Sequence, residues 1–242
     1  MLRAATFTYL ETKVTGFEDA QPLSRPFETK SCRHKGLGQI VETDPGIGCA
    51  PLDMSETLIL ASASPRRLEL LRKAGISFEV HPAHIREERN PGETPLAYAL
   101  RLAEEKARTV AQTFSGRYVL GADTIVVADE HVLEKPRDHA DAARMLRLLS
   151  GRPHEVTTAV SLIKPDGQSD TRASTTKVVF RALSEEEIQL YVASNEPMDK
   201  AGAYAIQGGA AGFADRMEGE YSNVVGLPLS LVTEMLRANG LR

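Results

Sequence analysis

From Thr57 onward, short apolar runs alternate with segments in which apolar residues recur every three or four positions. These are the periods of strands and helices, respectively. The first unit, residues 57–75 (TLILASASPRRLELLRKAG), predicts a strand that runs directly into a helix. Ser64 stands where an N-cap belongs, Pro65 suits the first helical position, and Gly75 supplies the stop. This strand–helix unit opens the ordered part of the chain.

The same signals predict further helices along the chain. Thr94 with Pro95 begins one, Asp138 begins another, and Ser184 with Glu187 forms a capping box for a third. The apolar face of the helix after Thr94 is predicted to comprise Leu96, Ala99, Leu100, Ala103, Ala107 and Val110. Strands are predicted over 76–81, 118–127, 155–163 and 172–181, with a turn at 129–130, a hairpin turn at Glu218–Gly219 and a last helix over 228–238. This mixture of hairpins and strand–helix units predicts an α/β fold with a mixed sheet.

Residues 1–53 differ from the rest of the chain. They mix glycine, proline and charges of both signs, and apolar residues show no sustained strand or helix period. We therefore expect an extension over 1–53 with little packed structure, followed by one domain over 54–242. Because Met54 directly precedes the ordered pattern, a natural start at Met54 is an alternative explanation of the extension.

Composition limits the classes of partner. The chain has 242 residues, of which 42% are hydrophobic and 26% charged, and its formal net charge is −4. These values are ordinary for a globular protein and do not indicate sequence-wide attraction to nucleic acid, so any anion recognition must be local. No apolar run approaches the length of a membrane span, and the N-terminus lacks the pattern of a signal peptide. We expect a cytoplasmic protein that binds neither membrane nor nucleic acid.

The helix that starts at Pro65 has an unusual first turn. Arg66 and Arg67 stand where the helix dipole favours acidic side chains, which costs about 0.3–1 kcal/mol per charge at an exposed site. A bound phosphate would reverse the sign, since free amides, both guanidinium groups and the hydroxyls of Ser62 and Ser64 could donate to it. The alternative is a solvated arginine pair at the edge of the sheet.

Asp123 lies inside the apolar run YVLGADTIVV, where an ionised carboxylate is costly unless it is paired, metal-bound or hydrogen-bonded. A salt-bridged aspartate at a strand end is one interpretation. However, Lys106, Lys135 and Lys200 each stand beside small residues or proline, and with the arginine pair they could surround a polyphosphate. A carboxylate among such cations can hold a divalent ion or deprotonate a water that attacks phosphorus. Each lysine taken alone is equally consistent with a solvated surface charge.

The chain resembles the Maf family of nucleoside triphosphate pyrophosphatases in seven motifs of matching order and spacing: SASPRR, LAEEKA, GADTIV, LEKP, SGRPHEVTT, DKAGAYAIQG and NVVGLPL. The resemblance covers Met54 to the C-terminus. It implies a mixed twisted sheet with flanking helices and two lobes around a cleft, as in inosine triphosphate pyrophosphatases, and a homodimer. It also implies cleavage between the α and β phosphorus atoms, giving the monophosphate and pyrophosphate, with a divalent cation, Mg²⁺ or Mn²⁺.

The resemblance also implies roles for single residues. Asp123 matches the general base and a metal ligand. The phosphate-binding positions are Ser62, Ser64, Arg66, Lys106, Lys135 and Lys200. Ser64 is included because of its place at the start of the helix, and the others because they match the family motifs. Glu87 matches a second metal or water ligand, but the segment reads IREE where the family often has Asp-Glu, so Glu88 is the alternative.

Specificity follows from three positions. Within the family, the subgroup similar to dTTP and UTP pyrophosphatases combines the residues found here as Arg67, Thr124 and Gln207, whereas the 7-methyl-GTP subgroup typically has Asp-Gln and a glutamate. The amide of Gln207 offers one donor and one acceptor, which suits the N3–H and carbonyl edge of uracil or thymine. The same amide could instead cap a glycine-rich turn.

We therefore expect a housecleaning hydrolase that acts on dTTP, UTP and related or modified pyrimidine triphosphates. Two alternatives stay open. The first is a nucleotide-binding regulator of cell division or septum formation, which would bind without turnover. The second is a pyrophosphatase for non-canonical purine nucleotides, which would turn over ITP or XTP fastest.

Overall fold

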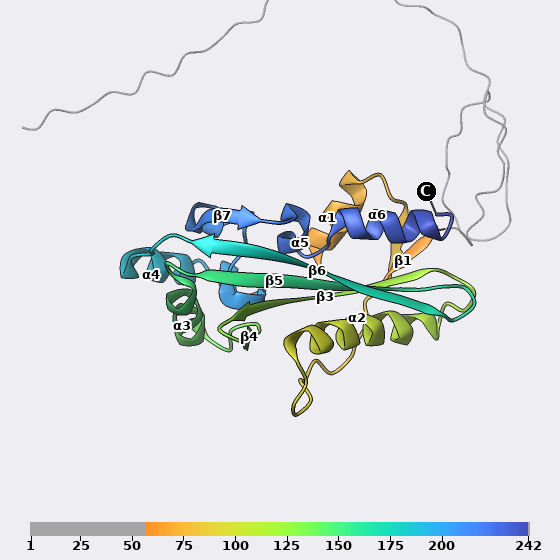
Figure 1. Ribbon diagram of the computed structural model, residues 1–242, viewed down its shortest axis with the longest axis horizontal. Coiled ribbons are helices and arrows are strands. Elements are labelled where there is room, and N and C mark those ends of the chain that lie inside the picture. Colours follow the sequence, from red (N-terminus) through yellow and green to blue (C-terminus); the bar gives the residue numbers. More distant parts are fainter. Residues whose placement is uncertain (1–56, 242) are drawn as a thin grey trace, which may run out of the picture. The chain divides into compact units, whose positions relative to one another are not determined.

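The computed structural model describes residues 57–241, so the extension predicted over 1–53 lies outside the described residues. Seven strands form one sheet in the order β2-β1-β3-β5-β6-β7, and β4 also pairs with β3 (Figure 1). The strands are β1 (Leu58–Leu60), β2 (Phe78–Val80), β3 (Val119–Ala128), β4 (His131–Leu133), β5 (Pro153–Ile163), β6 (Ser169–Phe180) and β7 (Ala214–Glu218). β1 is parallel to β2 and to β3, whereas the other pairs are antiparallel. The predicted mixed α/β fold is confirmed.

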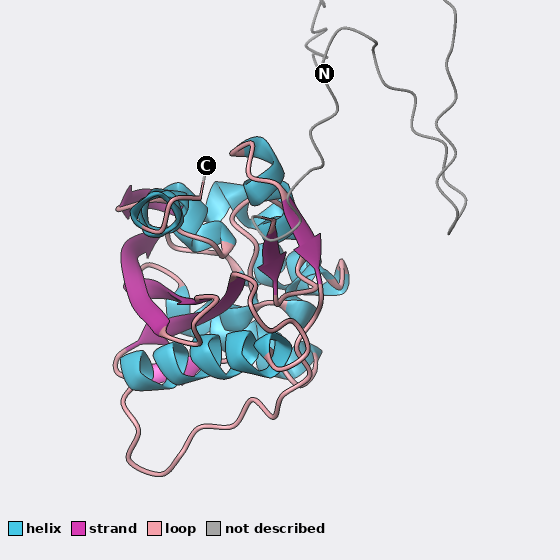
Figure 2. Cartoon of the chain, turned by 90° about the vertical axis from the view of Figure 1, so that its right-hand side faces the viewer, coloured by secondary structure: helices cyan, strands magenta, loops and turns pink. Residues whose placement is uncertain are grey.

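Helices cover both sides of the sheet, with α2 on one face and α6 on the other (Figures 1 and 2). They are α1 (Pro65–Lys73), α2 (Pro95–Ala111), α3 (His139–Leu149), α4 (Glu185–Ala193), α5 (Tyr221–Val225) and α6 (Leu229–Ala238), with 3₁₀ turns η2 (Glu196–Asp199), η3 (Ala201–Ala203) and η4 (Gly209–Phe213). No helix within residues 57–241 is both long and apolar enough to cross a membrane.

Local capping explains where the helices begin. The Thr94 hydroxyl accepts a hydrogen bond from the Ala97 amide (3.2 Å), and the Asp138 carboxylate accepts one from the Asp141 amide (2.7 Å). Ser184 and Glu187 make both bonds of the predicted capping box. Each bond satisfies an amide that the first turn leaves without a helical partner. Ser64 occupies the N-cap position of α1, but its side chain makes no capping bond.

One edge of β3 is only partly paired with other strands, which leaves an opening in the sheet. β5 pairs with it over Val119–Val127 on the other edge, so β1 and β4 must share the edge that remains. β1 pairs with Val119 and Leu120, and β4 pairs with Val126–Ala128. Residues 121–125 therefore have no strand beside them on this edge. The opening lies in the middle of the sheet and exposes the centre of β3 from the side.

Alternate residues of β3 point to different layers. Leu120, Ala122 and Val126 belong to the main apolar core, while Ile125 packs with Tyr98 and other residues of α2. α2 lies directly on the strand at Gly121, where an added Cβ would stand 2.3 Å from the Ala103 carbonyl oxygen. Asp123 is on the α2 face and Thr124 on the opposite one, because side chains of a strand alternate.

Two predictions are wrong. Leu96 was expected on the apolar face of α2 but is 50% exposed, because it belongs to the first turn, before the apolar cluster that begins at Tyr98. No hairpin turns at Glu218–Gly219, since the chain passes from β7 into α5. β7 instead pairs with β6, which comes much earlier in the chain, so no returning strand is needed. Thr176 of β6 holds the corner through hydrogen bonds of 3.1 Å with both backbone groups of Glu220.

Candidate active site

A pocket of about 650 Å³ opens beside the central residues of β3. Because the strand is uncovered there, the pocket reaches both faces of the sheet and is lined by Asp123 from one and Thr124 from the other. Every site residue predicted from the sequence lines it: Ser62, Ser64, Arg66, Arg67, Glu87, Lys106, Asp123, Thr124, Lys135, Lys200 and Gln207. Tertiary folding thus brings together residues from six separate stretches of the chain.

The α2 side of the pocket contains a lysine between two carboxylates. Lys106 Nζ lies 2.6 Å from Asp123 Oδ1 and 2.7 Å from Glu87 Oε1. Asp123 is buried, and burial raises its pKa although Lys106 and Arg67 act in the opposite direction. A carboxylate with a raised pKa is a stronger base than a solvated one, provided that a cation keeps it ionised. Lys106 is placed to do so.

Glu87, and not Glu88, belongs to the pocket. Partial burial raises the pKa of Glu87, but the hydrogen bond and charge of Lys106, with Lys135 and Arg67, bring it below its ordinary value. Glu88 does not line the pocket, and its carboxylate pairs with exposed Arg86 at 2.5 Å.

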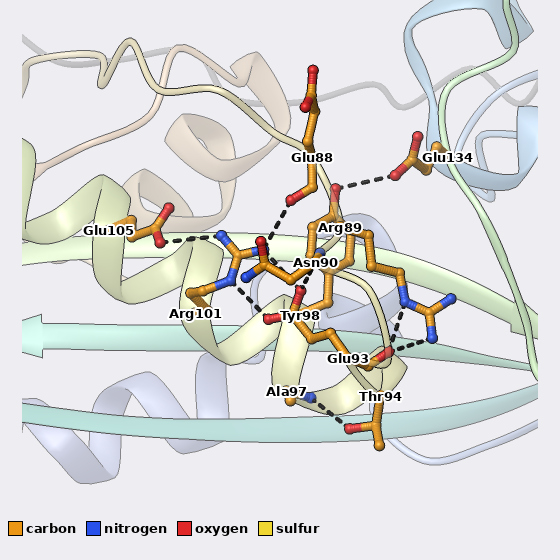
Figure 3. A network of polar contacts seen from close by, with 10 residues as sticks. All are labelled: Glu88, Arg89, Asn90, Glu93, Thr94, Ala97, Tyr98, Arg101, Glu105 and Glu134. Carbon is orange, nitrogen blue, oxygen red and sulfur yellow. Dashed lines mark hydrogen bonds and ion pairs between the residues drawn. The ribbon is translucent and has the colours of Figure 1, made fainter.

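The loop that carries Glu87 is tied to α2 (Figure 3). Arg101 donates to the Glu88 carbonyl oxygen at 2.9 Å and to both carboxylate oxygens of Glu93 at 2.7 and 2.8 Å. Tyr98, one turn earlier on α2, donates from its hydroxyl to Glu134 at 3.1 Å. Because these bonds hold the loop and the segment before Lys135 against the same helix, they orient two walls of the pocket. Sequence reasoning does not find Tyr98 or Arg101, which look like ordinary surface residues of an amphipathic helix.

On the opposite face, Arg67 is held by three neutral oxygens. Its guanidinium donates to the Gly226 carbonyl (2.8 Å), the Ser62 hydroxyl (3.2 Å) and the Thr124 hydroxyl (3.0 Å). Burial lowers the pKa of Arg67. Within residues 57–241 no carboxylate makes an ion pair with it, so its charge favours an anionic or strongly polar ligand in the pocket.

A buried polar chain fixes Thr124. Its hydroxyl lies 3.0 Å from that of Thr158 on β5, and Thr158 in turn donates to the Asn223 carbonyl at 2.9 Å. Sequence reasoning finds neither Thr158 nor Asn223 as a site residue, although both stand in the quoted motifs SGRPHEVTT and NVVGLPL. Thr158 is one of several buried polar residues of β5, and nothing in the local pattern distinguishes it from Thr157 or Ser161.

The remaining cations come from separate segments. Arg66 stands in the first turn of α1, where Ser64 leaves its hydroxyl without a capping role. Lys135 is exposed at the end of the β4 segment. The Lys200 ammonium contacts Asp199 Oδ1 at 2.5 Å and the Glu196 carbonyl oxygen at 2.8 Å. With Arg67 and Lys106, these groups place five cationic side chains in a lining that also holds the carboxylates of Glu87, Asp123, Glu134 and Asp199.

Gln207 lies on an exposed turn beside the apolar part of the pocket. Its side chain makes no hydrogen bond with any residue in 57–241, so the alternative interpretation as a cap of the glycine-rich turn is not observed. The apolar lining nearby comes from Val126, Leu133, Val156, Tyr204, Ile206 and Val225. An apolar wall with one free amide suits a planar group that carries a polar edge.

The carboxylates are compatible with a divalent cation. Lys106 occupies one oxygen of Asp123 and one of Glu87, leaving a second oxygen on each. No cluster of three or more histidine, cysteine or acidic residues with metal-binding geometry occurs in the described part of the chain. Mg²⁺ is typically held by one or two carboxylates together with substrate phosphates, so this donor set fits such an ion in the presence of a polyphosphate.

Comparison with known proteins identifies the family of the chain. The family model described as "Maf-like protein" matches residues 57–239. The dTTP/UTP pyrophosphatase of Koribacter versatilis is 56% identical over 184 residues, which are 76% of this chain and 95% of that protein. The dTTP/UTP pyrophosphatase of Citrifermentans bemidjiense is 53% identical over 187 residues, which are 77% and 97%. A HAM1 protein from Coxiella burnetii is 16% identical with a TM-score of 0.44, covering 75% of this chain and 98% of that one, a likeness too weak to add to the argument. The chain belongs to the Maf-like protein family.

Proposed function

We propose that this chain hydrolyses dTTP, UTP and related or modified pyrimidine nucleoside triphosphates to the monophosphate and pyrophosphate. The observation that carries the proposal is the buried carboxylate of Asp123, which lies in one pocket with cationic side chains from separate segments. The choice of dTTP and UTP as substrates is supported by the names of relatives that are more than half identical to this chain.

The cations suit a triphosphate. Arg66 and the α1 N-terminus offer guanidinium and amide donors, Ser62 and Ser64 add hydroxyls, and Lys135 and Lys200 lie on other walls of the same pocket. Phosphate oxygens are recognised by such donors, and helix N-termini favour anions. Groups that offset charge on the departing pyrophosphate lower the barrier without taking part in bond breaking.

Asp123 acts as the general base in this proposal. It accepts a proton from a water whose oxygen forms a bond to the α phosphorus, while the bond from that phosphorus to the bridging oxygen breaks and pyrophosphate leaves. Burial raises the pKa of Asp123 toward the range useful to a base, and Lys106 keeps the carboxylate ionised.

Asp123 and Glu87 would hold a divalent cation, Mg²⁺ or Mn²⁺, through the oxygens that Lys106 leaves available. When bound, such a cation neutralises phosphate charge and orients the reacting groups. Full loss of turnover in EDTA, with recovery on added Mg²⁺, is the expected result, and undiminished turnover in EDTA would refute the metal requirement.

Gln207, Arg67 and Thr124 would select the base. Uracil and thymine present carbonyl oxygens on either side of N3–H, and the free amide of Gln207 can pair with one donor and one acceptor of that edge. Cytosine presents the same edge with donor and acceptor exchanged (N4–H₂ and N3), so it matches only an amide that is turned over, and selectivity against CTP requires that the Gln207 amide keep one orientation.

The test is pyrophosphate release with Mg²⁺ across dTTP, UTP, CTP, ITP, XTP, 7-methyl-GTP and the standard purine triphosphates. Turnover confined to dTTP, UTP and close relatives supports the proposal. Fastest turnover on ITP or XTP would favour the purine alternative. Saturable binding without turnover would favour a nucleotide-binding regulator of division.

The family resemblance also supports a homodimer. Light scattering of the purified full chain tests the dimer directly, since a monomer mass at working concentration would contradict it.

A further inference from the structure

A tyrosine and a glutamate outside the pocket hold the turn that carries Gln207. Tyr191 lies near the end of α4 and Glu196 begins η2, and neither lines the pocket. The Tyr191 hydroxyl accepts a hydrogen bond from the Ala205 amide at 3.0 Å and donates to Glu196 Oε1 at 3.2 Å. Glu196 Oε2 accepts from the Gly209 amide at 3.0 Å. The two side chains therefore form one bridge that reaches the turn at two points.

The two points stand on either side of Gln207, two residues before it and two residues after it. Between them, the Gly208 amide donates to the Ala205 carbonyl at 3.1 Å and closes the turn. The carboxylate of Glu196 approaches so closely that a Cβ on residue 208 would stand 1.8 Å from Glu196 Oε1, so any side chain at this position would displace the carboxylate. The bridge thus contacts the turn along its length.

The Gln207 side chain has no hydrogen bond of its own among residues 57–241, so only its backbone holds it beside the pocket. A group that reads a base edge must be placed to within a fraction of an ångström, because hydrogen bonds weaken steeply with distance and angle. The backbone of Gln207 is in turn held by the two amides that the bridge binds.

We propose that Tyr191 and Glu196 are positioning residues that set base selectivity through Gln207. This inference rests on the proposed function, in which Gln207 recognises the pyrimidine edge. Glu196 also accepts a bond from Lys200 through its carbonyl oxygen, whereas Tyr191 has no bond to a cation of the pocket. Tyr191→Phe therefore tests the turn without disturbing the phosphate side.

Tyr191→Phe removes one oxygen and keeps the ring, which packs edge-on against Phe213 with centroids 5.3 Å apart. The matched control is Tyr118→Phe, which removes a hydroxyl that donates to the Asn239 carbonyl at 3.1 Å, away from the pocket. Loss of an anchor that misplaces a recognition group by a fraction of an ångström is expected to reduce discrimination about tenfold. Discrimination is kcat/KM on dTTP divided by kcat/KM on CTP.

The experiment measures this ratio for the wild type, Tyr191→Phe, Gln207→Ala, the double variant and Tyr118→Phe. We expect the ratio to fall about tenfold in Tyr191→Phe, to stay at the wild-type value in Tyr118→Phe, and to show no further fall when Tyr191→Phe is added to Gln207→Ala. A merely structural role would lower kcat/KM equally on both nucleotides and would act in both backgrounds.

An unchanged ratio in Tyr191→Phe, or an equal fall in the Gln207→Ala background, would overturn the inference while leaving the proposed function intact. If Gln207→Ala itself discriminates like the wild type, the specificity role of Gln207 fails and the inference fails with it. Glu196→Ala is the second variant, should Tyr191→Phe not fold. It keeps the backbone carbonyl that holds Lys200 but removes both carboxylate oxygens, and with them the bonds to Tyr191 and to the Gly209 amide, so the same fall in the ratio is expected.

Discussion

Removal of the Lys106 ammonium tests whether the carboxylate at the centre of the pocket depends on it. Lys106→Met keeps the length and apolar stem of the side chain and removes only the charge and its donors. The chain offers a matched control in Lys73→Met, because Lys73 pairs with Glu69 at the same 2.6 Å distance as Lys106 with Asp123. The side chains of the first pair are 66% and 54% exposed, and those of the second 10% and 9%.

The burial of each ion pair determines how much folding stability its lysine substitution should cost. Removing one partner of a buried ion pair leaves an uncompensated charge and costs about 3–5 kcal/mol, a large part of the 5–15 kcal/mol by which a typical domain is stable. The exposed pair is screened by water, so Lys73→Met should have no measurable effect. Burial already raises the pKa of Asp123, and loss of Lys106 removes the main charge that opposes this rise. The cost of Lys106→Met should therefore be largest at alkaline pH and shrink as Asp123 gains a proton in acid.

The assay is urea unfolding followed by far-ultraviolet circular dichroism, in metal-free buffer at about pH 8 and about pH 5, with pyrophosphate release measured in parallel. Lys106→Met in an Asp123→Asn background should recover most of the stability, because neither charge is then buried alone. The reasoning is refuted if Lys106→Met costs no more than Lys73→Met, or if the Lys106 and Asp123 substitutions are additive.

Three further predictions concern single residues. Asp123→Asn should abolish pyrophosphate release while the protein stays folded by circular dichroism, although the melting temperature falls because Lys106 loses one of its two carboxylate partners; a wild-type rate would remove Asp123 from the mechanism. Gly121→Ala places a Cβ 2.3 Å from the Ala103 carbonyl, so it should cost about 1–3 kcal/mol and slow turnover by displacing the helix that carries Lys106; an unchanged melting temperature would contradict this. Burial lowers the pKa of His154 from 6.5 to about 4. Between pH 6.5 and pH 4 the unfolded chain therefore binds more protons than the folded one. The contribution of the neutral histidine to the free energy of unfolding is complete above pH 6.5 and is lost as the pH falls toward 4. Urea unfolding should show a loss of about 2 kcal/mol between about pH 7 and about pH 5 that is absent in His154→Gln, and equal pH slopes would count against the buried neutral histidine.

The candidate site was predictable as a set of residues but not as an arrangement. Motif spacing and family resemblance bring Asp123, Lys106 and Gln207 into one hypothesis, and all three line the pocket. They do not indicate that Lys106 lies between two carboxylates, or that Tyr191 supports the turn of Gln207. Those contacts join segments far apart in the chain, and no local pattern records which side chains meet.

What the sequence by itself determined is the local structure. Helix starts at Thr94, Asp138 and Ser184 are set by side chains that bond amides three residues away, so they follow from residue type and spacing alone. Only the tertiary structure decided that β1 and β4 share one edge of β3 and leave residues 121–125 uncovered, and that β7 returns to β6 without a hairpin. Strand pairing between distant segments depends on the packing of the whole core, and that packing creates the opening in which the site lies.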